Sequence, residues 1–187
     1  MIIRLDKKHY PQIIEIWESS VRATHHFLKP EEIGFYKPLV LHYALPENTL
    51  FGTCNNNRLT GFIGLRSPKV EMLFIHPDFF GQGLGSKLLN FAVQEQNCSL
   101  VDVNEENPRA YKFYLKHGFV LKSRDELDDS GKPHPTLHLE HPTHKRIIIL
   151  QIDSYNAGFP SPINQADQYC RQKNQPLEIN TAQQIIG

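Results

Sequence analysis

The stretch at residues 77–86 constrains the fold of this chain more than any other. It reads Pro-Asp-Phe-Phe-Gly-Gln-Gly-Leu-Gly-Ser. An apolar run at residues 70–75 leads into it, and apolar residues at helical spacing follow from Leu84 to Val93. The pattern predicts a strand, a turn through three glycines and then a helix. The first N–H groups of a helix have no partner within it, and glycine lets a ligand approach the backbone, so such a turn is suited to binding phosphate.

Two common phosphate loops do not fit this stretch. A Walker loop ends in Gly-Lys-Ser or Gly-Lys-Thr, whereas here Lys87 follows Ser86. A Rossmann fingerprint requires G-x-G-x-x-G and an acidic residue at a set distance, whereas the glycines here are spaced G-x-G-x-G. The hypothesis that the protein is a nicotinamide oxidoreductase would therefore rest on the glycines alone. A glycine-rich turn before an ordinary helix is the simplest alternative to a phosphate site.

The same stretch closely resembles the acyl-CoA loop of the GNAT-type N-acetyltransferases. The loop of that family runs Arg/Gln-x-x-Gly-x-Gly/Ala between a strand and a helix, and residues 80–85 match it at both glycines. Phe80 stands where the family has Arg or Gln. Because main-chain N–H groups hold most of the pyrophosphate, the resemblance implies a working loop that has lost one side-chain contact.

The composition is that of a globular protein without an excess of charge. Hydrophobic residues make up 40% and charged residues 21%, and 20 basic residues balance 20 acidic ones. This balance favours neither a nucleic-acid nor a membrane partner. The cysteines, Cys54, Cys98 and Cys170, are odd in number and far apart, which favours free thiols in a reducing compartment. With no signal-peptide core and no apolar run of about 20 residues, we expect a cytoplasmic protein.

Apolar and turn patterns predict the element order β-α-α-β-β-β-α-β-α-β-β. Strands are expected at residues 2–5, 49–53, 59–66, 70–75, 100–103, 119–127 and 136–140. Helices are expected after Asp6, from Pro30, from Leu84 and at residues 107–117, with Pro38 dividing the second into two short pieces. This order predicts a mixed α/β fold with a central mixed, mainly antiparallel sheet and helices on both faces.

The resemblance to the GNAT family extends over residues 1–142 and is greatest to its small bacterial members. Several segments carry it in the right order: Ser-Val-x-Ala-Thr-His-x-Phe-Leu at 20–28, Val-Asn-Glu-x-Asn at 103–107, Phe-Tyr-x-Lys-x-Gly-Phe at 113–119 and Asp-Asp-x-Gly-Lys-Pro at 128–133. We therefore expect a GNAT domain at residues 1–142. Residues 143–187 would be a C-terminal extension that could pack on the core, mediate a dimer or belong to another module.

The resemblance implies transfer of an acetyl group from acetyl-CoA to a primary amine by direct attack. The acceptor would be a small molecule or a peptide, and the protein a monomer or a homodimer. No metal is expected, because the histidines between residues 134 and 144 lack a completing set of ligands. An acyl-CoA-binding module without turnover, acting on a partner through the extension, is the alternative. Phe80 slightly favours this module, whereas Glu71, Asn107 and Tyr114 favour the enzyme.

Tyr114 is the candidate general acid. Asn107, Ala110 and Tyr114 share one face of the predicted helix, so the phenol could project over the cofactor thiol. The family carries its general-acid tyrosine in this Phe-Tyr pair. A phenol with a pKa of about 10 is protonated at pH 7 and can donate to the leaving thiolate. A core aromatic whose hydroxyl bonds elsewhere is the alternative.

Glu71 is the candidate base, acting directly or through water. Strand alternation places Glu71 on one face with Leu73 and Ile75, where a carboxylate is unusual. Burial would raise the pKa of such a carboxylate toward a value useful for catalysis. A salt-bridged residue at the start of the strand is the alternative.

The resemblance assigns the remaining contacts to four segments. The strand at residues 70–75 would splay from its neighbour, so that the main chain of Leu73, Phe74 and Ile75 pairs with the pantetheine arm. The pyrophosphate would be held by Gly81, Gln82, Gly83, Leu84, Gly85 and Ser86. Asn107 would cap its helix and touch the cofactor. Thr24, His25 and Phe27 close the first helix and are expected to recognise the acceptor, with helix-end packing as the alternative. Four basic residues could bind the 3′-phosphate of CoA: Lys87, Arg109, Lys112 and Lys116. Exposed, solvated charge is the alternative for each of them.

Overall fold

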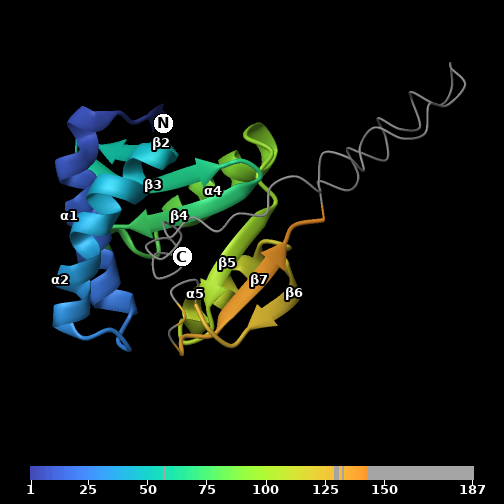
Figure 1. Ribbon diagram of the computed structural model, residues 1–187. Helices are drawn as coiled ribbons and strands as arrows, with labels where there is room; N and C mark the ends of the chain where they lie inside the picture. Colours follow the sequence, from blue (N-terminus) through green and yellow to red (C-terminus); the bar gives the residue numbers. More distant parts are fainter. Residues whose placement is uncertain (57, 129–130, 132, 143–187) are drawn as a thin grey trace, which may run out of the picture.

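The computed structural model describes residues 1–56, 58–128, 131 and 133–142. In this part of the chain, one sheet has the strand order β1-β2-β3-β4-β5-β7-β6 (Figure 1). β4 and β5 pair in parallel, and the other neighbours pair antiparallel, which confirms the predicted mixed sheet. The strands are β1 (Ile2–Arg4), β2 (Thr49–Asn55), β3 (Arg58–Arg66), β4 (Lys69–Ile75), β5 (Leu100–Asn104), β6 (Val120–Asp125) and β7 (Thr136–Glu140).

The helices begin at residues that cap them or fit their first turn. Asp6 accepts a hydrogen bond from the Lys8 N–H, and Asn107 accepts one from the Ala110 N–H. Gly118, with φ of 86°, follows the end of α5. The helical elements are η1 (Lys7–His9), α1 (Tyr10–Thr24), α2 (Pro30–Leu39), η2 (Val40–Ala44), α3 (Leu45–Glu47), η3 (Pro77–Phe79), α4 (Leu84–Glu95) and α5 (Pro108–Lys116).

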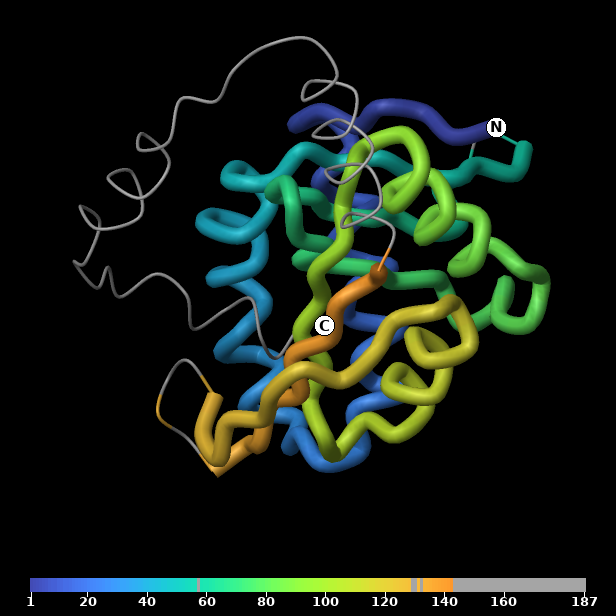
Figure 2. Tube along the Cα trace, turned by 90° about the vertical axis from the view of Figure 1, so that its right-hand side faces the viewer, coloured from blue at the N-terminus to red at the C-terminus, as the bar shows by residue number. Residues whose placement is uncertain are grey.

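Two hydrophobic clusters lie on opposite faces of the sheet. The neighbours Phe62 and Ile63 of β3 are both fully buried and belong to different clusters, as alternation along a strand requires. Phe62 packs with residues of α1 and α2, among them Trp17, and Ile63 packs with residues of α4, among them Leu88. Figure 2 shows α2 and the α4–α5 pair on either side of the strands. The prediction of helices on both faces is therefore confirmed.

The expectation that Pro38 divides the second helical stretch is wrong. Pro38 lies inside α2, and the chain stays helical through η2 and α3 to Glu47. η2 is a π-helical turn that begins two residues after Pro38. Proline has no backbone N–H to donate to the carbonyl four residues earlier, and its ring crowds the preceding turn of the helix. A wider, π-helical turn accommodates the proline without ending the helix.

Candidate active site

A cleft forms where β4 and β5 separate. Their pairing is confined to Lys69 with Leu100 and Val70 with Val101, and beyond these pairs the two strands diverge (Figure 1). The expected splay of this strand is thus confirmed. The cleft has a volume of about 420 Å³. Its lining comes from the end of α1, from β4, from the glycine loop and from α5: Ser20, Thr24, His25, Leu73, Phe74, Ile75, Phe79, Phe80, Gly81, Gly83, Leu84, Gly85, Ser86, Asn107, Arg109, Ala110, Phe113, Tyr114 and Lys116.

The glycine loop turns sharply before α4. Gly81 and Gly83 have φ of 77° and 76°, a region in which residues with a Cβ are strained. A Cβ at either position would meet nothing within 4 Å, so the space above the loop is open to a ligand. Gln82 is exposed, its amide Nε2 lies 3.4 Å from the Asp78 carbonyl, and it does not line the cleft. The other five residues predicted in this loop do.

Tyr114 lies in the wall of the cleft on α5. Its ring packs against Phe113 and Phe119, with centroids 5.2 and 5.5 Å away, and the residue is 4% exposed. Burial raises the pKa of the Tyr114 phenol, which keeps the hydroxyl protonated at neutral pH. Asn107, one turn before Ala110, uses its Oδ1 to cap α5, which leaves its Nδ2 donors for other partners.

Glu71 occupies a β-bulge and does not line the cleft. Gly64 pairs with Met72 and Leu65 pairs with Val70, so Glu71 is the extra residue between two pairs. Its carboxylate is 2% exposed and is held by Arg66 Nη2 at 2.9 Å and by Lys69 Nζ at 3.4 Å. The expected alternation fails here, because the bulge places Val70 rather than Glu71 in the cluster that Leu73 and Ile75 contact.

The predicted acceptor residues separate into two groups. Thr24 and His25 line the cleft at the end of α1, whereas Phe27 does not. The Phe27 ring packs near both His25 and His134, with centroid distances of 5.4 and 5.9 Å. Ser20 also lines the cleft, and the sequence analysis missed it. Because Ser20 lies four residues before Thr24 on the same face of α1, helical spacing could have found it.

Two basic side chains of α5 line the cleft. Of the four that we considered for the 3′-phosphate, Arg109 and Lys116 line the cleft, and Lys87 and Lys112 do not. The Arg109 guanidinium lies 4.6 Å from the centroid of the Phe80 ring, which is within the range of a cation–π contact. The uncharged Phe80 ring therefore holds the positively charged Arg109 side chain beside the glycine loop.

Three findings concern metal ligands, membrane-spanning helices and cysteines in the described part of the chain. Within residues 1–142, as far as they are described, no cluster of three or more His, Cys, Asp or Glu side chains is suited to a metal ion. In the same part of the chain, no helix has the length and apolar character needed to cross a membrane. Cys54 is exposed and Cys98 buried, both as free thiols, whereas Cys170 and the expectations for residues 143–187 lie outside the described residues.

Comparison with known proteins identifies the class to which this fold and cleft belong. Residues 46–121 match the family model of the acetyltransferase (GNAT) domain. The chain is 36% identical over 146 residues to the peptidyl-lysine N-acetyltransferase YjaB of Salmonella typhimurium, which covers 76% of this chain and 100% of that protein. The chain therefore belongs to the GNAT family and is an acetyltransferase.

The structural neighbours agree with this assignment. The solution structure of apo-form YjaB from Escherichia coli matches with a TM-score of 0.69 at 36% sequence identity, covering 75% of this chain and 96% of that chain. PaiA N-acetyltransferase from Thermoplasma acidophilum, solved in complex with coenzyme A, matches with a TM-score of 0.61 at 18% identity. It covers 75% of this chain and 98% of its own, and at this identity the likeness shows the fold alone.

Proposed function

We propose that this enzyme transfers the acetyl group of acetyl-CoA to the side-chain amine of a lysine in a peptide or protein. One observation carries the proposal: the glycine loop, the splayed part of β4 and the buried Tyr114 phenol all line a single cleft. The acceptor class is supported by the 36% identity to a protein named peptidyl-lysine N-acetyltransferase. A reducing cytoplasm, which supplies acetyl-CoA, also suits the free thiols of Cys54 and Cys98.

The cofactor would lie across the cleft from α4 to α1. Its pyrophosphate would accept hydrogen bonds from the N–H groups that follow Gly81, at the positive end of α4. Its pantetheine arm would pair with the edge of β4 at Leu73 to Ile75, which β5 leaves uncovered where the strands diverge. The thioester would then lie near Tyr114, between the loop and the end of α1.

Tyr114 is the proposed general acid of this reaction. As the amine nitrogen bonds to the thioester carbon, negative charge develops first on the carbonyl oxygen and then on the departing sulfur. The phenol can donate its proton to that sulfur, because burial keeps it protonated. Among the described residues its hydroxyl makes no hydrogen bond that would compete. This available donor also favours the enzyme over an acyl-CoA-binding module without turnover.

Glu71 acting through water stays a candidate base, but its geometry supports a structural role better. Its carboxylate is 2% exposed and is held in ion pairs by Arg66 and Lys69, so it contributes to the packing of β3 against β4. Glu71 also lies outside the cleft lining.

Two measurements on the full chain test the proposal. First, thermal unfolding is followed with acetyl-CoA, CoA and NADH in parallel. A ligand at 100 times its Kd adds about 2.7 kcal/mol to the free energy of unfolding, which raises the midpoint temperature of unfolding by several degrees. We expect a shift with both CoA ligands and none with NADH. An absent shift with the CoA ligands would contradict the cofactor assignment.

Second, a peptide with a blocked N-terminus and one lysine is incubated with the enzyme and acetyl-CoA. We expect a mass increase of one acetyl group and an equal release of CoA. The same peptide with arginine in place of lysine is the control and should not change. Acetylation of spermidine but not of the lysine peptide would replace the peptide acceptor by a small polyamine.

A further inference from the structure

Ser20 lies on α1 where that helix borders the cleft. The residue is 5% exposed and lines the cleft. A serine in a helix often donates to the carbonyl four residues earlier, but the Ser20 hydroxyl makes no hydrogen bond within the described part of the chain. A buried hydroxyl without a partner is unfavourable, so this group is suited to a ligand that enters the cleft.

The neighbouring polar side chains at the end of α1 are engaged or closed off. Thr24 Oγ1 donates to the Ser20 carbonyl oxygen at 2.8 Å and lies 2.8 Å from His25 Nδ1. The other ring nitrogen, His25 Nε2, has less than 1 Å² of accessible surface. Of the three residues at this end of α1 that line the cleft, Ser20 is therefore the one whose side chain can bond to a ligand.

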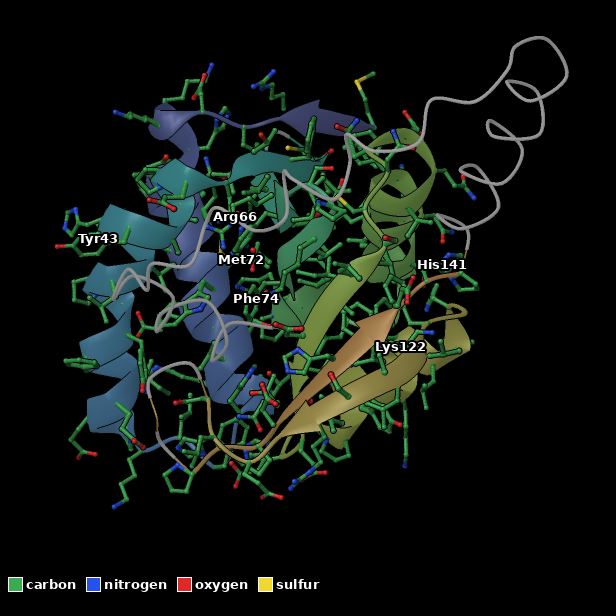
Figure 3. The ribbon with its side chains drawn as sticks, turned by 45° about the vertical axis from the view of Figure 1, so that its right-hand side comes forward. Tyr43, Arg66, Met72, Phe74, Lys122 and His141 are labelled. Carbon is green, nitrogen blue, oxygen red and sulfur yellow. The ribbon has the colours of Figure 1, made fainter. Side chains whose placement is uncertain are left out.

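This end of α1 lies beside the part of β4 that β5 leaves uncovered. The ring centroid of Phe74, on β4, is 6.4 Å from that of His25, and Phe74 lines the same cleft. Figure 3 shows Phe74 beside α1. The pantetheine arm is proposed to follow β4 here, so a substrate amine that reaches the thioester passes along the face of α1 that carries Ser20.

Few side chains in the cleft could accept a hydrogen bond from a substrate amine. Among the described residues that line it, none is a carboxylate, and the two cations, Arg109 and Lys116, can only donate. Asn107 Oδ1 already accepts from the backbone of α5. The N–H groups of an amine therefore depend on hydroxyl oxygens in this cleft.

Four hydroxyls line the cleft, and three of them have another role. Ser86 lies in the first turn of α4, where the pyrophosphate is expected. Tyr114 is the proposed proton donor to the sulfur, and Thr24 is engaged at the end of α1. The oxygen that remains for the amine is Ser20 Oγ.

We propose that Ser20 binds and orients the substrate amine by accepting a hydrogen bond from one of its N–H groups through Oγ. The proposal rests on the function proposed above. An ammonium and a neutral amine both carry N–H groups, so the contact persists when the amine loses its proton. With one N–H held by Ser20, the nitrogen lone pair can be directed at the thioester carbon. Ser20 therefore acts on the amine and takes no part in binding acetyl-CoA.

The test compares Ser20→Ala with Ser19→Ala, using the blocked single-lysine peptide as acceptor. We expect kcat/KM for the peptide to fall by about tenfold in Ser20→Ala, which is typical of one lost hydrogen bond to a ligand. The KM for acetyl-CoA and the acetyl-CoA thermal shift should not change. Ser19 precedes Ser20 on the same helix and does not line the cleft, so its substitution should leave all three quantities unchanged.

Thermal unfolding without ligand separates a binding role from a structural one. Alanine has a higher helix propensity than serine, and the Ser20 hydroxyl has no hydrogen bond among the described residues to lose. The unfolding midpoint of Ser20→Ala should therefore equal or exceed that of wild type, so a loss of activity could not be due to a weaker fold. A midpoint several degrees lower would show that the protein itself uses the hydroxyl, and would overturn the proposal.

The pH profile separates orientation of the amine from proton transfer. Because Ser20 accepts an N–H from either charge state, kcat/KM of Ser20→Ala should be lower than that of wild type by a constant factor from about pH 6 to about pH 9. A factor that changes with pH would assign Ser20 to proton transfer instead. Activity within about twofold of wild type, or an equal loss of affinity for acetyl-CoA, would also overturn the contact with the amine.

Failure of the proposed function would give a different result. If the wild type acetylates spermidine but not the peptide, the peptide acceptor is wrong, and Ser20→Ala is compared with Ser19→Ala on spermidine instead. The primary amines of spermidine offer the same N–H groups, so a loss of about tenfold confined to Ser20→Ala would still support the contact. An unchanged kcat/KM for spermidine in Ser20→Ala would overturn it.

Discussion

The guanidinium of Arg109 lies 4.6 Å from the centroid of the Phe80 ring, and both residues line the cleft. The two residues come from different segments, since Phe80 precedes the loop and Arg109 lies in the first turn of α5. GNAT loops with Arg or Gln at the position of Phe80 provide a polar side chain there. In this chain the Phe80 ring instead contacts the Arg109 guanidinium of α5.

Arg109→Ala should therefore weaken acetyl-CoA binding by about tenfold, or roughly 1.4 kcal/mol, because a phosphate of the cofactor loses a cation that lines the cleft. Calorimetric titration of wild type and variant with acetyl-CoA and with dephospho-CoA measures the loss of affinity. Lys112→Ala removes a charge from the same helix outside the cleft and should have little effect. Phe80→Leu should show part of the loss, and the double variant no more than Arg109→Ala alone. Equal affinities for Arg109→Ala and wild type would disprove the role of this pair.

Glu71→Gln should destabilise the fold and leave the chemistry intact. The substitution removes a buried negative charge that faces Arg66 and Lys69, and breaking a buried ion pair costs roughly 3 kcal/mol. Urea unfolding measures the loss. Glu47 meets Arg66 at 3.5 Å with 45% of its side chain exposed, so Glu47→Gln should cost less than about 0.5 kcal/mol. A normal unfolding curve together with lost turnover would instead identify Glu71 as the base.

His138 should make the stability depend on pH. Burial opposes its charge, but hydrogen bonds and charges from Asp102 and Asp125, 2.7 and 3.1 Å away, raise the pKa of His138 overall. A raised pKa in the folded state means that this stabilisation is fully present below the unfolded value of about 6.5 and is lost as pH rises through the folded value. The difference in unfolding free energy between wild type and His138→Gln should thus shrink from pH 6 to pH 9. A constant difference over this range would show that the positive charge of His138 contributes nothing to stability.

Local patterns in the sequence were sufficient for the fold and for much of the cleft. Glycines with positive φ, the Asn-Pro start of α5 and the alternation of Phe62 and Ile63 are local features whose consequences are nearly independent of the rest of the chain. For this reason the glycine loop could be predicted from local patterns, whereas the splayed strand and the place of Tyr114 beside it were expected from the resemblance to the GNAT family. The order of the elements followed from the same signals.

Features that depend on two segments could not be found in this way. The bulge at Glu71 is a mismatch between β3 and β4, and neither strand shows it alone. The contact of Arg109 with the Phe80 ring joins residues 29 positions apart, and no local pattern in either segment indicates it. Pro38 is a different case, because the helix accommodates it through a π-helical turn that no local rule requires.

Tyr114→Phe separates cofactor binding from catalysis. The ring still packs against Phe113 and Phe119, so the fold and the acetyl-CoA thermal shift should be unchanged. The sulfur must then leave without its proton donor, and kcat should fall by about 100-fold or more. Tyr111→Phe removes a hydroxyl from the same helix outside the cleft and should keep full activity. Because burial raises the pKa of Tyr114, the acid is lost only as pH rises through that raised value, so the wild-type rate should not decline between pH 7 and 9. Full activity in Tyr114→Phe would exclude the phenol as the acid and leave solvent to protonate the thiolate.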